Sequence, residues 1–305
     1  GASNTAIGGN SVLFANTTGD FNTAVGTTAL AANTTADDNT AVGHQALLTS
    51  TTGANNTAVG KAALRLSTTS AGNTAVGVAA LCTNTTGASG TAIGHYALNA
   101  NTTGNLNAAV GESALLTNTE GDYNTAVGAR SLKLLQSTDF NTAAGYAALE
   151  AVTTGGGNTA LGFAAGHTVT DGDCNVGIGY RSGHYGTSAQ YQIIIGSGDS
   201  SNNFTSGGDN QIRMGKRDAY INNSFASNAN WSHSSDRRYK KDIAKNKIGL
   251  DFINDLNTVT YKWKAESELD PSLSEYDANK TQADCEKTQH GLIAQEVKES
   301  MNKLG

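Results

Sequence analysis

Residues 232–243, which read SHSSDRRYKKDI, are the part of the sequence best equipped for chemistry. Three serines precede four basic residues that fall within the five positions 237–241. A serine hydroxyl is a poor nucleophile unless a neighbouring base takes its proton. A lysine can be that base only when it is neutral, which requires burial or nearby positive charge to lower its pKa. The segment is therefore either a nucleophilic site or the solvated, basic start of a helix with Ser235 or Asp236 as its N-cap.

Other clusters that could carry chemistry are lacking in the sequence. Cys82, Cys174 and Cys285 lie far apart and form no CxxC and no zinc-spaced group with histidine, so we expect buried small residues, no metal and no cofactor. The net charge of −6 argues against a nucleic-acid partner. The longest apolar run is too short to span a membrane.

A repeat of 17 residues fills most of the chain before this segment. Its consensus is N-T-A-V-G-x-x-A-L-x-x-N-T-T-G-x-x, and its positions are numbered here from the first Asn. The first step, from Asn4 to Asn22, is 18 residues, and every later step to Asn175 is 17. With 36 Gly and only 6% aromatic residues in 305, the composition suits a thin, regular fibre better than a round globule. The sequence begins in mid-repeat at Gly1, so we expect it to be a fragment.

Each unit is predicted to hold two short strands, T-A-V and one centred on A-L, with Gly and Asn in the turns. Seventeen residues bounded by such turns leave no room for a stable helix. Stacked units would form apolar ladders at positions 4 and 9, and the Asn column could hydrogen-bond from unit to unit. At about 4.8 Å per strand, eleven units make a rod of roughly 50 Å.

A single coil of this kind would have a narrow core and would leave the Val or the Leu column partly exposed. A parallel homotrimer would bury the ladders against a common axis, and a monomeric solenoid is the alternative. Over about residues 4–196 the units resemble the head repeats of trimeric bacterial adhesins, which form a left-handed parallel β-roll, and are similar to repeats of phage and large-virus fibres.

Position 6 varies along the chain and becomes aromatic late in the repeats, at Tyr146, Phe163 and Tyr180, near His167 and His184. These side chains either stack on the sugars of a host surface or reflect a change in packing as the repeats end.

A shift in composition divides the chain. Residues 1–195 hold 5 Lys/Arg and 10 Asp/Glu, whereas residues 235–305 hold 12 and 13. We expect a repeat shaft over 1–196, a connector with two short strands over 197–234, and a separate domain over 235–305. In that domain we expect a helix around 248–256, a strand at 259–263, and a strand turning into a helix at 291–297.

Three motifs in order, SDRRYK, VTYKWK and GLIAQEV, resemble the endosialidase-type intramolecular chaperone family, which ends phage tail fibres and tailspikes. The resemblance implies a small α+β domain that trimerises, helps the fibre to fold and then cuts itself off. The family domain continues past GLIAQEV into long helices, so we expect it to be truncated here.

The same resemblance assigns the cleavage site. It places the cut at Ser234–Ser235, with Ser235 as nucleophile and Lys240 as base. The positive charges of Arg237, Arg238 and Lys241 would lower the pKa of Lys240. Asp236 would oppose this effect if it lay close, so we expect it to have a structural role, such as orienting Arg238. His233 is an alternative base. The resemblance implies one event in cis per chain and no activity on external substrates.

The sequence therefore predicts an all-β fold: a trimeric parallel β-roll or β-solenoid shaft of 17-residue repeats, followed by a small α+β chaperone domain. The predicted function is a viral, usually phage, tail fibre or spike that attaches to a host-surface receptor, with a glycan as one option. Such a protein is made in the host cytoplasm and ends in the virion. The alternatives are a bacterial trimeric adhesin head and an enzyme-bearing tailspike.

Overall fold

The computed structural model describes residues 1–184, 187–198, 204–205, 209–216, 219–224, 255–262, 264, 266–269, 279 and 289–303. The chain forms two compact units, Gly1–Ser232 and His233–Gly305. The described residues are nearly all β, and each unit is treated by itself below.

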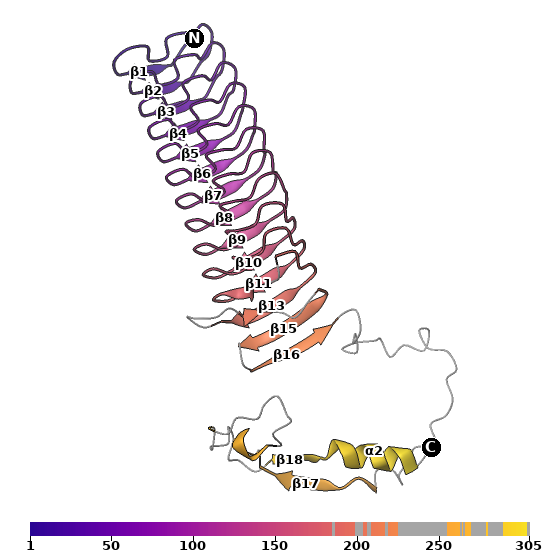
Figure 1. Ribbon diagram of the computed structural model, residues 1–305. Coiled ribbons are helices and arrows are strands. Elements are labelled where there is room, and N and C mark those ends of the chain that lie inside the picture. The colour runs from indigo at the N-terminus through magenta and orange to yellow at the C-terminus, as the bar shows by residue number, and fades with distance from the viewer. Residues whose placement is uncertain are drawn as a thin grey trace, which may run out of the picture. The chain divides into compact units, whose positions relative to one another are not determined.

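The first unit is a β-solenoid in which each 17-residue repeat makes one rung (Figure 1). The T-A-V segments are strands, as predicted, and each pairs in parallel with the same three positions of the next rung, for example Ala58 with Ala75. The strands are β1 Thr5–Ile7, β2 Thr23–Val25, β3 Thr40–Val42, β4 Thr57–Val59, β5 Thr74–Val76, β6 Thr91–Ile93, β7 Ala108–Val110, β8 Thr125–Val127, β9 Thr142–Ala144, β10 Thr159–Leu161, β11 Val176–Ile178 and β13 Ile193–Ser197.

The predicted second strand around A-L is wrong, because this stretch forms turns. Leu64 has a φ of 49° and Ala62 a φ of 59°, and the same two positions are left-handed along the shaft. The physical reason is that Ala63 and Leu64 are both fully buried. Adjacent residues of a strand point to opposite faces, so a strand here would expose one of the two.

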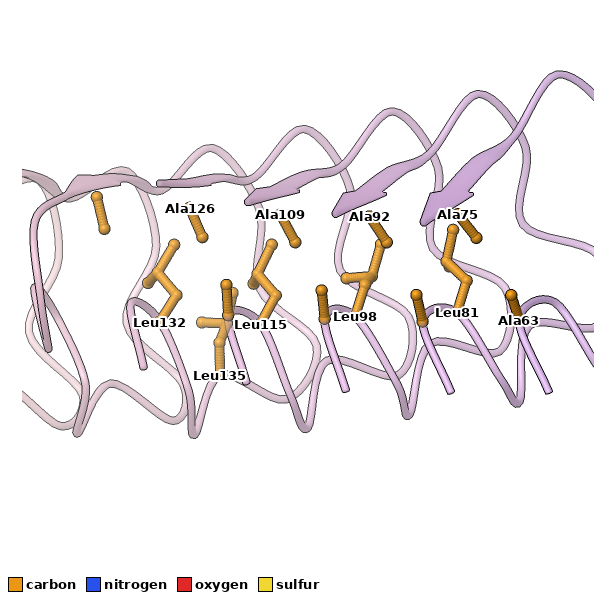
Figure 2. Packing of buried hydrophobic residues seen from close by; sticks show 14 of the residues in the cluster. Ala63, Ala75, Leu81, Ala92, Leu98, Ala109, Leu115, Ala126, Leu132 and Leu135 are labelled. Atoms are coloured by element: carbon orange, nitrogen blue, oxygen red, sulfur yellow. The ribbon is translucent and has the colours of Figure 1, made fainter. Parts of the chain in front are cut away.

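The core of the solenoid is a stack of small and medium aliphatic side chains (Figure 2). Ala92 points inward from its strand toward Leu98, and the same pair recurs in the neighbouring rungs. Because strand residues alternate, position 4 lies on the outer face: Val59 is 36% exposed and Leu161 52%. The predicted partial exposure of one apolar column is confirmed, and that column is the one at position 4.

The column of Asn residues at position 1 is buried and forms the predicted rung-to-rung ladder. Asn56 Nδ2 donates to Asn39 Oδ1 at 3.2 Å and to the Ser70 carbonyl at 2.9 Å. The backbone N–H of Asn73 donates to Asn56 Oδ1 at 3.0 Å. Where asparagines follow one another, each amide thereby pairs the polar groups of its own rung and of the adjacent rungs, as buried polar groups require. Gly90 interrupts the column, and its backbone N–H donates to Asn73 Oδ1 at 2.8 Å.

A second interior column, at position 12, changes character along the shaft. Asn118 Nδ2 donates to Asn101 Oδ1 at 3.0 Å, and Asn101 Nδ2 to Asn84 Oδ1 at 2.8 Å. The next three members of the column are fully buried and apolar: Leu135, Val152 and Val169. The polar members before them are Asn16, Asn33, Ser50, Ser67, Asn84, Asn101 and Asn118.

Glycine at position 5 lets the rungs approach closely as the strand ends. Gly60 has a φ of 138°, and a Cβ there would lie 2.4 Å from the carbonyl oxygen of Gly77. Any larger residue would meet both strain and a clash with the next rung.

The shaft ends in longer strands. β15 (Gln211–Lys216) pairs in parallel with β13, and β16 (Ala219–Ser224) pairs antiparallel with β15, so both strands predicted in the connector are confirmed. β12 (Ser182–His184) pairs with β14 (Phe204–Thr205), which places the buried ring of Phe204 over the last rungs. The guanidinium of Arg213 lies 4.0 Å from the ring centroid of Tyr220.

In the second unit, β17 (Thr258–Tyr261) pairs antiparallel with β18 (Gln289–Leu292), and α2 (Ala294–Lys303) follows β18. A short 3₁₀ helix, η2, spans Glu266–Glu268. The predicted strand and the predicted strand-to-helix segment are confirmed. The helix expected around 248–256 lies almost wholly outside the described residues.

Candidate functional site

The residues assigned to self-cleavage lie outside the described part of the chain. This holds for Ser235, Asp236, Arg238 and Lys240, for the Ser234–Ser235 bond and for His233. Their roles therefore stay predictions.

The described elements of the second unit bring two of the three motifs together. Val259 of VTYKWK stands opposite Gly291 of GLIAQEV in the β17–β18 pair. The hydroxyl of Ser300 in α2 is 3.4 Å from the carbonyl oxygen of Asp255, just before β17. A strand and a helix more than thirty residues away are thereby joined in one α+β arrangement.

The outer face of the shaft sheet is the larger candidate surface. Aliphatic side chains of position 4 run along its centre, and Ile93, Val110 and Val127 are 41%, 36% and 44% exposed. Positions 17 and 6 flank each strand, and they too expose large apolar residues. A contiguous apolar surface of this length is typical of a binding interface rather than of a free surface.

The aromatic column at position 6 is a ladder of three rings. The centroids of Tyr146 and Phe163 are 5.3 Å apart with an interplanar angle of 14°, and those of Phe163 and Tyr180 are 5.3 Å apart at 13°. Arg130 donates to the Tyr146 hydroxyl at 3.2 Å and pairs with Glu150. These bonds, the one to Tyr146 foremost, raise the pKa of Arg130.

Of the histidines expected near this ladder, the structure describes the side chain of His167. His167 Nδ1 lies 3.0 Å from the carbonyl oxygen of Ala164, within its own rung. The side chain of His184 lies outside the described residues.

A second exposed aromatic column, at position 17, was missed by the sequence reasoning. Tyr123 and Phe140 stack with centroids 5.4 Å apart and planes at 11°. Tyr191, three rungs beyond Phe140, is 54% exposed in the same column. The 17-residue spacing of these aromatic residues is visible in the sequence and could have predicted the column. It was overlooked because position 17 has no consensus residue.

The cysteine prediction is right for one residue and wrong for another. Cys82 is buried, whereas Cys174 is exposed because it occupies the outward-facing position 17. Within the described residues, no group of three or more His, Cys, Asp or Glu side chains could hold a metal ion. The described helices include none that is long and apolar enough to cross a membrane.

Comparison with known proteins identifies the C-terminal segment. Residues 235–305 match the family described as chaperone of endosialidase. Neither the curated proteins nor the solved structures contain a match. A β-solenoid of 17-residue repeats followed by this chaperone segment fits a protein of the tail fibre or tailspike kind.

Proposed function

We propose that this protein is the homotrimeric shaft of a viral tail fibre or tailspike, which attaches to a host surface and is folded by a C-terminal chaperone that cuts itself off. The observation that carries the proposal is the match of residues 235–305 to the endosialidase chaperone family directly after a β-solenoid. Attachment to the outside of a host is the role that such a fibre serves.

Three chains around one axis would cover the aliphatic column at position 4, which runs along the centre of the outer face of the sheet. In the single chain every described member of the aliphatic column at position 4 is at least partly exposed, and Val127 is 44% exposed. Burying apolar surface contributes about 25 cal/mol per Å², and the same small gain recurs in every rung. A parallel arrangement places identical rungs at the same height, so the apolar columns meet without a shift.

Light scattering after size-exclusion chromatography tests the trimer. We expect three times the chain mass, or three times the shaft mass if cleavage has occurred. Val59→Lys with Val127→Lys should give monomers, because three lysines per level would meet near the axis. Thr52→Lys with Thr103→Lys, at exposed positions outside the strands, is the matched control. A monomeric wild-type chain contradicts the proposal.

The cleavage would begin with attack of the Ser235 hydroxyl on the carbonyl carbon of Ser234, while neutral Lys240 takes the hydroxyl proton. The C–N bond between the two residues would then break, Lys240 would return the proton to the leaving nitrogen of Ser235, and Ser234 would be held as an ester on the Ser235 oxygen. Water then hydrolyses the ester and leaves a carboxylate at Ser234 and an amine at Ser235. Arg238 would keep the pKa of Lys240 low, and Asp236 would orient Arg238.

Intact mass spectrometry tests this assignment. The wild-type chain should yield a fragment that begins at Ser235, whereas Ser235→Ala and Lys240→Ala should stay full length. Ser234→Ala, which changes the other side of the scissile bond, should still be cut. Release of a fragment from either of the first two variants would rule out the Ser–Lys pair.

The regular rungs explain why such a fibre needs a chaperone. Every strand pairs with the same three positions of its neighbour, so a shift by one rung again aligns like residues. A C-terminal clamp would fix the three chains at one height, and removing it afterwards would lock the product kinetically.

A further inference from the structure

A groove opens at one corner of the shaft, where the aromatic column at position 17 is interrupted. Phe140 and Tyr191 bound it, and the two rungs between them carry only Gly157 and Cys174 at that position. The groove has a volume of about 560 Å³. Its other lining residues are Ser137, Thr138, Asp139, Thr154, Gly156 and Asp173.

The distance between Phe140 and Tyr191 leaves room for a ligand that contains rings. Three rungs of about 4.8 Å separate Phe140 from Tyr191 by roughly 14 Å, and two of those levels lack a ring. Tyr123 and Phe140, with centroids 5.4 Å apart, show how rings stack in this column when both levels are filled. A ring of a bound ligand can therefore stack on the side chain of Phe140 or of Tyr191.

The side of the groove supplies hydrogen-bond acceptors in fixed positions. Asp139 Oδ1 accepts the backbone N–H of Asp122 at 2.7 Å, and Asp173 Oδ1 accepts that of Gly156 at 2.8 Å. Each carboxylate keeps acceptor capacity for a further donor. None of the ten lining residues is a lysine or an arginine, whereas two are aspartates, so the charge of the groove disfavours an anion.

We propose that this groove binds a neutral oligosaccharide of the host surface. A pyranose ring has an apolar C–H face that would stack on Phe140 or Tyr191, and hydroxyl groups that would donate to Asp139 and Asp173. Apolar walls with a few fixed polar groups are the usual composition of a ligand site. The inference rests on the proposed attachment role and assigns that role a receptor class and a place.

A glycan array probed with the full-length protein is the first test. The array carries neutral oligosaccharides of different linkage and polysialic acid as an anionic probe. We expect binding to neutral members and none to polysialic acid. Absence of any neutral binder, or a preference for the anionic probe, overturns the proposal.

Variants locate the site. Cys174→Phe should abolish binding by filling the groove, and it should fold, because Phe140 and Tyr191 occupy position 17 with φ of 64° and 55° against 56° for Cys174. Tyr191→Ala should weaken binding roughly tenfold through loss of one stacking wall. Phe21→Ala removes an equally exposed ring of the same column far from the groove and should bind like wild type. Binding retained by Cys174→Phe overturns the assignment.

Cys174 also reports occupancy directly. In a Cys285→Ser background, the bound glycan should slow alkylation of Cys174 by N-ethylmaleimide, while buried Cys82 stays unreactive in both states. Protection of Cys174 without glycan would mean that another copy of the chain fills the groove, and the proposal falls. Trimer mass and cleavage are measured in the same samples, so a failure of this site is distinguishable from a failure of the proposed function.

Discussion

The early and the late rungs of the shaft build the same coil with different interiors. Up to Asn118, position 12 is filled by amides or hydroxyls, whereas Leu135, Val152 and Val169 fill it with apolar groups. The strands and their register continue unchanged across the junction. Position 12 can therefore carry either hydrogen-bonded polar side chains or buried apolar side chains without a change in the strands. Other positions determine the geometry of the coil.

Two changes of residue type in this column leave an unpaired acceptor. Asn118 Oδ1 has no hydrogen-bond partner, because the next rung offers Leu135 instead of an amide. Asn33 Oδ1 is unpaired for the same reason, since Ser50 follows it. An unpaired buried acceptor costs about 1–3 kcal/mol, so uniform stretches of the column are more stable than alternating ones.

The largest loss of stability should come from substituting the glycine at position 5, and it should be equal in the early and the late rungs. Gly60→Ala and Gly162→Ala should each destabilise their rungs by about 3–5 kcal/mol, because both combine left-handed strain with a clash. The new Cβ would lie 2.4 Å and 2.5 Å from the carbonyl oxygens of Gly77 and Gly179. Hydrogen exchange followed by mass spectrometry measures the local loss of protection.

The matched control is Gly156→Ala, whose Cβ would meet nothing closer than 3.5 Å and which should change protection little. If Gly60→Ala and Gly162→Ala caused very different losses of protection, the residues in the interior would be shown to alter the backbone geometry of the coil.

The next largest loss of stability should occur only in the late rungs, where position 12 is apolar. Val152→Asn places an amide between Leu135 and Val169, where no neighbouring side chain can pair with its oxygen. We expect a loss of about 2–4 kcal/mol from burial and from the unpaired group. Chemical denaturation gives the value, and Val152→Ala measures the loss of burial alone. If Val152→Asn were as stable as Val152→Ala or more stable, the late rungs would tolerate an amide as the early rungs do, and the proposed difference between the two regions would be wrong.

The smallest effect should have the opposite sign. Ser50→Asn combined with Ser67→Asn introduces the same side chain at the same position of two polar rungs. The new amide at position 50 can donate to the unpaired Asn33 Oδ1, and the new oxygens at 50 and 67 each face an amide of the next rung. We expect a gain of about 0.5–1 kcal/mol. Thr52→Asn, at an exposed position two residues away, is the control and should leave the unfolding midpoint unchanged. A lower midpoint for the double variant would mean that the column has no room for amides at these two rungs.

Much of the shaft could be predicted because its period is visible in the sequence. The repeat indicated the T-A-V strands, the Asn ladder and two apolar columns at positions 4 and 9, since stacking like on like follows from an even spacing, but it left open which column is exposed. The A-L strand was wrong because burial of two adjacent residues requires left-handed φ at Leu64, and leucine has no propensity that signals it.

The candidate sites were less accessible to sequence reasoning. The groove beside Tyr191 arises where Gly157 and Cys174 supply no ring, and a missing side chain forms no motif. The Ser235 assignment came from a resemblance of motifs. The spacing of Ser235 and Lys240 in the sequence says nothing about the distance between their side chains.

The unchanged register of the rungs makes the reach of the fibre an adjustable quantity. Inserting or deleting one 17-residue unit changes the length by about 4.8 Å and leaves both flanking surfaces intact. In the proposed tail fibre, tandem duplication of a short gene segment would then be enough to tune how far from the particle a host surface is met. Selection can act on that distance in steps no larger than one strand.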